Sequence, residues 1–238
     1  AGFGSLASAL ILGRRLGFGT PSVMAGHNVP YQFLALFLLW FGWNGFNGGS
    51  ALAANGIAVS AIVATNLAAA GAGLSTVLLG WAVTKKPSAS LGANGPIAGL
   101  AAVTPASGYI EPWAGLVIGL IAGVVFYVGV LFFKNRLKVD DVCDVIAIHG
   151  MTCVWGTLSV AIFASPMITG GVSGLVYGST ELVGPQAVGT ATGAAFGFVG
   201  TYVILRVINA VTPIRVKPEQ EEIGEDISLH GEESYRLA

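Results

Sequence analysis

Charged residues are scarce in this sequence: Asp, Glu, Lys and Arg make up 10% of its 238 residues, against about 25% in a soluble domain. Hydrophobic residues make up 54%, and the mean hydropathy is +0.76. So few charges cannot cover a water-facing surface, so we expect lipid around the chain. The net charge of −1 gives no basic excess of the kind that binds nucleic acid, and we expect no such partner.

Cysteine is also rare. Cys143 and Cys153 stand ten residues apart in one apolar run, about 15 Å along a helix, which is too far for a disulfide. We therefore expect two buried thiols. The sequence has no cluster of metal-ligating residues, no nucleophile triad and no phosphate-binding loop, so we expect no metal, no cofactor and no enzyme.

Long apolar runs dominate the sequence. Residues 1–13 would form a helix of about 20 Å, short of a bilayer core of roughly 30 Å, and we expect the end of a truncated transmembrane helix. Within 29–211 the alternating pattern of membrane strands is absent, which predicts helices. We expect Pro96 and Pro105 to interrupt the third of the six further runs, because proline removes a backbone donor. These runs are 29–50, 57–83, 90–107, 112–133, 143–165 and 186–211.

The positions of the basic residues test this division into spans. If the helices alternate in direction, all eleven fall on one side of the membrane: Arg14, Arg15, Lys85, Lys86, Lys134, Arg136, Lys138, Arg206, Arg215, Lys217 and Arg236. Loops on the cytoplasmic side carry such an excess, so we expect residues 212–238 to form a cytoplasmic tail. The acidic composition of the tail favours a disordered end over a regulatory or docking segment.

Two series of glycines occur in the spans. Glycines spaced four apart lie on one face of a helix and allow close approach of another helix in a membrane. We expect both series to mark contacts within the helix bundle or between subunits. The two series are Gly115, Gly119 and Gly123, and Gly189, Gly193 and Gly197.

His149 is an ionisable residue inside an apolar span, which is costly and marks a candidate functional site. A neutral imidazole can donate and accept one hydrogen bond each, which suits a small polar solute in a dry passage. A histidine that bonds a neighbouring helix for packing explains the residue equally well. Asp140, Asp141 and Asp144 open the same helix, where its dipole stabilises acidic groups. Asp144 lies deeper, and we expect it to anchor the helix to neighbouring backbone groups.

An aromatic face is predicted on the span 29–50. Leu39, Trp43, Phe46 and Ser50 are spaced 4, 3 and 4, so they share one side of a helix. Such a face with a hydroxyl at its rim can hold a small cation by cation–π attraction and a hydrogen bond. An interfacial aromatic belt with core packing is the alternative. The depth of Trp43 in the span favours the binding site.

At these residues the chain resembles the Amt/Mep/Rh ammonium transporter family, and the Amt branch in particular. The similarity lies in four ordered segments that cover most of the chain: Phe-Gly-Trp-Asn-Gly-Phe-Asn-Gly-Gly-Ser (41–50), Gly-Leu-Ala-Ala-Val-Thr-Pro-Ala-Ser-Gly-Tyr (99–109), Val-Asp-Asp-Val-Cys-Asp-Val-Ile-Ala-Ile-His-Gly (139–150), and the tail 219–235 with its Ser-Leu-His-Gly-Glu.

The resemblance implies an all-α polytopic membrane protein, a helix bundle built from an inverted five-helix repeat and an eleventh helix. This chain would hold the second repeat, the eleventh helix and the tail, with the first half missing. The resemblance also implies a homotrimer. It further implies that the tail docks PII-type signal proteins through a segment that contains Gly224, His230 and Gly231.

The resemblance assigns roles to single residues. His149 matches the second histidine of the central pair, Phe46 one ring of the external aromatic gate, and Ser50 the external recruitment site. Pore-lining positions are matched by Trp43, Ile97, Thr104 and Val145. The first histidine of the pair would precede Ala1.

These features together predict ammonium or ammonia transport across the cytoplasmic membrane. The cation would be recruited and deprotonated at the outer aromatic site, and ammonia would pass a hydrophobic pore lined by His149. An ammonium sensor that acts through its tail with little flux is the alternative. A different solute carrier with broken helices fits less well, because mid-membrane charges are few.

Overall fold

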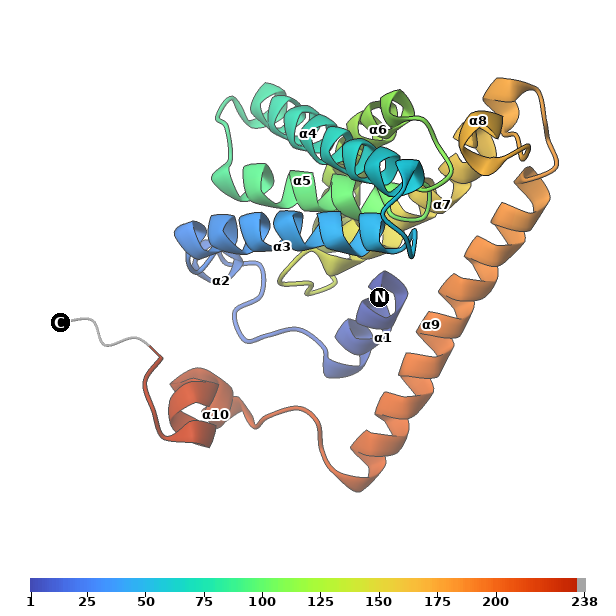
Figure 1. The fold of residues 1–238 in the computed structure, drawn as a ribbon. Coiled ribbons are helices and arrows are strands. Elements are labelled where there is room, and N and C mark those ends of the chain that lie inside the picture. Colours follow the sequence, from blue (N-terminus) through green and yellow to red (C-terminus); the bar gives the residue numbers. More distant parts are fainter. Residues whose placement is uncertain (235–238) are drawn as a thin grey trace.

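The fold is built from helices, as the sequence predicts. The computed structural model describes residues 1–234, and extended structure in that range is limited to one bridge between Ile110 and Ala164. Figure 1 shows the elements in chain order. They are α1 (Gly2–Leu12), α2 (Pro21–Met24), α3 (Val29–Gly49), α4 (Gly56–Thr84), α5 (Ala89–Val103), α6 (Pro112–Val130), π-helical η1 (Leu131–Arg136), π-helical η2 (Ile146–Met151), α7 (Thr152–Phe163), α8 (Pro166–Thr169), 3-10 helical η3 (Leu175–Tyr177), α9 (Val183–Val211), α10 (Pro218–Ile223) and π-helical η4 (Asp226–His230).

Side-chain caps begin three of the bundle helices. Asn28, Asn55 and Ser88 precede α3, α4 and α5, and each accepts a hydrogen bond from the amide three residues later. Such caps satisfy backbone donors that the first turn of a helix leaves unpaired. The polar residues between the apolar runs therefore fix where each helix starts.

Small residues hold α4 against α6. A Cβ added at Gly115 would lie 2.6 Å from the carbonyl oxygen of Ala64, and Gly119 and Gly123 pack as closely on the backbone of α4 at Ala68 and Ala72. The first predicted glycine series therefore marks a helix contact. A Cβ added at any glycine of the second series, on α9, would have no neighbouring atom within 4 Å among the described residues.

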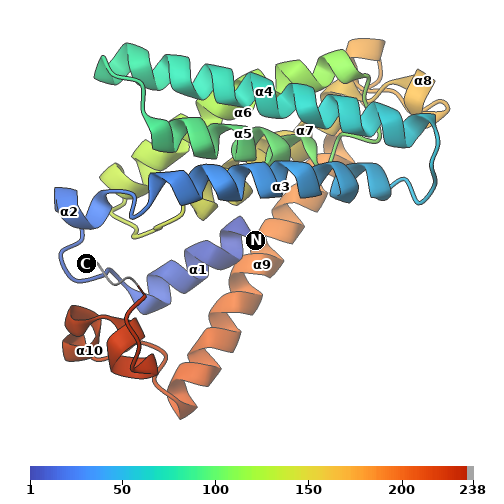
Figure 2. The ribbon, with the colours of Figure 1, turned by 60° about the vertical axis from the view of Figure 1, so that its left-hand side comes forward.

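Helix α5 is the centre of the bundle. Residues 95–103 are all buried, and α4, α6, α3 and α7 surround them (Figure 2). The expectation that Pro96 interrupts this helix is wrong, because α5 continues through it; Gly73 of α4 leaves room for the proline ring. The helix ends at Val103, just before Thr104 and Pro105, as proline after a helix favours.

Four segments are long and apolar enough to cross a membrane: Gly56–Thr84, Pro112–Arg136, Ile146–Phe163 and Val183–Val211. Helix α3 forms at the expected place with 21 residues, but its tryptophans, asparagines and glycines make it less apolar. Helices α5 and α1, with 15 and 11 residues, are shorter than a full span.

Helices α1 and α9 form a pair that lies at an angle to the bundle (Figure 1, Figure 2). Helix α9 has no buried residue. The start of α1 touches the bundle at one point, where a Cβ on Gly2 would overlap the backbone of His149 and Gly150. Glycine is required there because the two backbones are in direct contact.

Candidate functional site

His149 lies on the π-helical turn η2, which leads directly into α7. Single π-helical turns inside helices are rare and occur frequently at functional sites. The helix starts at Ile146, three residues later than the expected start at 143. The three aspartates therefore lie in the loop before the helix, and Asp144 has a left-handed φ of 57°.

Two of these aspartates have specific partners, and Asp141 holds the start of η2. Asp141 is 9% exposed, and its Oδ2 accepts a hydrogen bond from the Ile146 amide at 2.7 Å. Asp140 accepts from the guanidinium of Arg15 at 2.9 and 2.8 Å and from the Arg15 amide at 2.8 Å. Burial raises the pKa of Asp140, but the bonds from Arg15 outweigh it and hold the pKa below its usual value. A general dipole effect was expected for both residues, whereas the structure gives each a specific partner.

Asp144 anchors the helix, but through side chains rather than the backbone groups we expected. Its Oδ1 pairs with Lys134 Nζ at 2.5 Å, and its Oδ2 accepts from Asn94 Nδ2 at 3.1 Å. The three residues come from η1, from α5 and from the loop before η2. Asp144 therefore ties three segments together at the end of the bundle near Arg15 and Lys134, which we call the basic end.

The rings of Trp43 and His149 face each other. Their centroids are 6.3 Å apart, and the two planes differ by 6°. Trp43 Nε1 donates to Thr104 Oγ1 at 2.8 Å, and Thr104 donates in turn to the Leu100 carbonyl at 2.7 Å. Three predicted site residues from α3, the end of α5 and η2 thus meet at one place.

The ring nitrogens of His149 make no hydrogen bond to the part of the chain that the structure describes. The packing alternative for this residue needs such a bond, because a buried polar group is costly without a partner. No hydrogen bond among the described residues supports the packing alternative, and the role of His149 stays a prediction.

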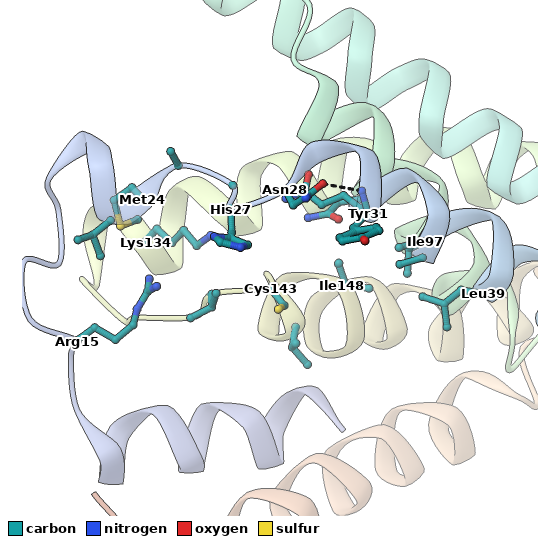
Figure 3. A pocket seen from close by; sticks show the side chains of 18 of the residues that line it. Arg15, Met24, His27, Asn28, Tyr31, Leu39, Ile97, Lys134, Cys143 and Ile148 are labelled. Atoms are coloured by element: carbon teal, nitrogen blue, oxygen red, sulfur yellow. Dashed lines mark hydrogen bonds between the residues drawn. The ribbon is translucent and has the colours of Figure 1, made fainter. Parts of the chain in front are cut away.

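A cavity of about 760 Å³ leads from the basic end to His149. Figure 3 shows Leu39, Ile97 and Ile148 at one end of it and Arg15, His27 and Lys134 at the other. The cavity is also lined by Val145, so four of the predicted site residues share it: Leu39, Ile97, Val145 and His149. Its lining is apolar beside His149 and polar at the basic end.

Phe46 and Ser50 lie at the opposite end of α3. Phe46 is 61% exposed and touches the Trp43 ring edge to face, with centroids 6.3 Å apart. Ser50 is exposed at the end of the helix, and its hydroxyl donates to the Phe46 carbonyl at 2.7 Å. Their roles as gate and recruitment site stay predictions.

Several polar residues of the cavity were missed by the sequence reasoning. Asn94 and Gln32 line it, and Gln32 Oε1 is buried without a hydrogen-bond partner among the described residues. For Asn94, the signal in the sequence was a side-chain amide within an otherwise apolar run. Cys143, expected to be buried, is exposed and lines the same cavity, whereas Cys153 is largely buried and its thiol contacts the Ala101 carbonyl.

The described part of the tail is held against the segment that follows α1. Arg215 donates to the carbonyls of Leu12 and Arg14, and pairs with Glu221 at 2.8 Å. Glu221 also accepts from the Leu16 amide at 2.7 Å, and this bond lowers its pKa. The tail therefore takes a defined position, unlike the disordered end that its composition favours.

The three predicted regulatory residues lie in the turns of the tail. Gly224, with φ of 106°, separates α10 from η4, and His230 ends η4 before Gly231, with φ of 72°. Both glycines adopt a backbone conformation that other residues rarely reach. Their regulatory role stays a prediction.

Comparison with known proteins explains why these features occur together. A sequence profile described as the Ammonium Transporter Family matches residues 1–235. The chain belongs to the ammonium transporter family. It is 42% identical over 236 residues to the ammonium transporter Amt1 of Archaeoglobus fulgidus, which covers 99% of this chain and 59% of the relative. It is 39% identical over 237 residues to an ammonium transporter of Bacillus subtilis, with coverage of 99% and 58%.

Solved structures of ammonium transporter proteins have the same fold. A protein described as a Sensor Amt Protein superimposes with a TM-score of 0.86 and 34% identity over 96% of this chain and 56% of that one. Mep2 of Saccharomyces cerevisiae superimposes with a TM-score of 0.83 and 33% identity, over 92% of this chain and 51% of that one. The chain thus spans a little more than half the length of these relatives. The family consists of membrane transporters rather than enzymes, as the sequence predicts.

Proposed function

We propose that the protein to which this chain belongs transports ammonium or ammonia across the cytoplasmic membrane. The observation that carries the proposal is the stacking of Trp43 on His149, which itself lines the apolar part of the cavity, in a member of the ammonium transporter family. An aromatic face attracts a cation, and an imidazole without a partner can bond a neutral amine.

The proposed mechanism begins at the outer end of α3. Ammonium is attracted by Ser50 and by the rings of Phe46 and Trp43. A bare cation is costly in an apolar passage, so ammonium leaves a proton at the outer side and continues as ammonia. His149 then offers hydrogen bonds to ammonia along a wall formed by Leu39, Ile97 and Val145. Potassium cannot lose a proton, and the passage therefore rejects it.

Methylammonium uptake by the protein at its native length tests this function. We expect His149→Ala to abolish uptake or to weaken the preference for ammonium over potassium. Thr157→Val is the matched control, since the Thr157 hydroxyl bonds only the Cys153 carbonyl within its own helix. Unchanged uptake and unchanged selectivity in His149→Ala would remove the histidine from the mechanism.

The proposal also specifies how the protein is oriented in the membrane and which partners it has. The basic end, with the tail beside it, faces the cytoplasm because cytoplasmic loops collect Lys and Arg. The protein assembles as a homotrimer, and the tail, including Gly224, His230 and Gly231, docks a PII-type signal protein. Support comes from the family resemblance and from the fixed position of the tail on Arg215 and Glu221.

An ammonium sensor with little flux is a second candidate, favoured by one path of contacts. The tail bonds the segment 12–16, and Arg15 in that segment bonds Asp140 just before η2. A change in the tail could thus reach the helix of His149. Deletion of 213–238 separates the two candidates: a transporter keeps measurable flux without the tail, whereas a sensor loses its output.

A further inference from the structure

The rotation of α3 about its own axis decides whether Trp43 faces His149. Successive residues of a helix are about 100° apart, so a modest rotation would turn the indole away. Within the described residues, α3 packs against the bundle through few buried positions. Only three of its 21 residues are buried, namely Leu36, Asn47 and Gly48. Gly42, Gly45 and Gly49 have no neighbouring atom within 4 Å of a built Cβ among the described residues.

Besides the bond from Trp43 to Thr104, a polar network between α3 and α4 constrains this rotation. Asn66 of α4 accepts from Trp40 Nε1 at 2.8 Å through Oδ1, and its Nδ2 donates to Asn44 Oδ1 at 2.6 Å and to the Ile62 carbonyl at 2.8 Å. Asn44 Nδ2 donates back to the Trp40 carbonyl at 3.0 Å. Two of these bonds, from Trp40 to Asn66 and from Asn66 to Asn44, cross between the helices, and the two bonds within each helix orient the amides that make them.

The network occupies the face of α3 next to the proposed site. Trp40 and Asn44 are displaced by about 60° and about 100° around the axis from Trp43, on one side of it. Leu39 and Phe46 lie about 40° and about 60° away on the other side. When Asn66 holds the first pair against α4, Trp43 and the second pair are directed toward η2. One turn further along, Asn47 donates to Thr65 Oγ1 of α4 at 2.9 Å and adds to the same face.

Hydrogen bonds between membrane helices act as specific constraints because lipid offers no competing partner. An apolar residue at position 66 could fill the same space but would permit several rotations of α3. In coiled coils, single buried asparagines fix the register of the helices in the same way that we infer for Asn66. We propose that Asn66, which lines no part of the cavity, is a positioning residue that sets the selectivity of the pore by holding Trp43 over His149. This inference rests on the transport function proposed above.

Asn66→Leu in the protein at its native length is the first test. We expect ammonium-over-potassium selectivity to fall roughly fivefold to tenfold, the loss that corresponds to one strong interhelical hydrogen bond in a membrane. Thr76→Val on α4 is the matched control, because the Thr76 hydroxyl bonds the Gly123 carbonyl of α6 and takes no part in the network with α3. A merely structural role would lower thermal stability in both variants and leave selectivity equal.

Trp40→Phe keeps the test decisive if Asn66→Leu does not fold. This variant retains an aromatic ring and removes only the indole donor to Asn66, so selectivity should fall in the same direction. In a double variant the two effects should be less than additive, since both remove one network. The proposal is overturned if both variants keep the parent selectivity while His149→Ala loses it. If His149→Ala also keeps it, the transport mechanism fails instead.

Discussion

At the scale of single residues, the candidate site is built on the stacked rings of Trp43 and His149. The Trp43 ring is held at its nitrogen by Thr104, and the His149 ring stands on a π-helical turn that Asp141 caps. The first bond fixes the plane of the aromatic ring. The second fixes the residue at which η2, the turn that carries His149, begins. The site is therefore ordered by its own polar contacts before any solute arrives.

Replacement of Thr104 by valine tests the first of these bonds. The shape is conserved, but Trp43 Nε1 loses its acceptor, and an unsatisfied buried donor costs about 1–3 kcal/mol. We expect a lower midpoint of thermal unfolding and weaker methylammonium uptake. Thr157→Val should change neither quantity, because its hydroxyl bonds only its own helix. Equal shifts in the two variants would contradict the role given to Thr104.

The Arg15–Asp140 pair makes stability depend on pH. The folded-state pKa of Asp140 is lowered, so its contribution is fully present above an unfolded pKa of about 3.9 and is lost as the pH falls through the lower folded value. Arg15→Gln should lower the free energy of unfolding by about 1–2 kcal/mol at neutral pH. The loss is smaller than for a fully buried pair because the Arg15 side chain is 38% exposed.

Chemical denaturation at several pH values measures this effect. The difference between Arg15→Gln and the parent should shrink as the pH is lowered below about 4. Arg136→Gln, at an exposed arginine without an ion pair in the described range, should be neutral throughout. A difference that is constant with pH would rule out the pairing as its cause.

The sequence singles out the candidate site residues more readily than the residues that position them. His149 and Trp43 stand out because a lone ionisable group and a deep indole are unusual in apolar spans. Arg15 and Asp140 are 125 residues apart, and no local pattern joins them. Asn66 and Asn94 look like ordinary polar residues until the neighbouring helix is known.

At the scale of elements, apolar runs predict the helices well, whereas helix ends and packing partners are less predictable. Pro96 was expected to break α5, but Gly73 on the neighbouring helix accommodates its ring. The two glycine series are alike in sequence, yet one packs closely on the backbone of α4, whereas added Cβ atoms in the other would meet no described atom within 4 Å. Spacing shows that glycines share a face; it does not show what that face touches.

Alanine substitution in each series tests this distinction. Gly119→Ala places a methyl group against the backbone of Ala68, and overpacking of this kind costs about 1–3 kcal/mol. Gly193→Ala on α9 meets no described atom, and it should be neutral or slightly stabilising because alanine favours helix. Thermal unfolding in detergent measures both variants. An unchanged midpoint for Gly119→Ala would contradict the close α4–α6 contact.

At the scale of the whole molecule, the chain forms a little more than half of an ammonium transporter fold. Its bundle supplies one wall of the proposed passage, and its cavity is polar at the basic end and apolar beside His149. In the proposed mechanism the cation is attracted at the other end of α3, by Ser50 and the aromatic rings, and the apolar wall conducts the neutral molecule.

Flux in liposomes that contain the native-length protein tests this central claim most directly. Ammonium-driven flux would be recorded with and without a hundredfold excess of potassium, which has a similar size but no proton to lose. The account predicts that potassium neither crosses nor slows the flux. Potassium flux comparable to that of ammonium would contradict passage as ammonia past Trp43 and His149.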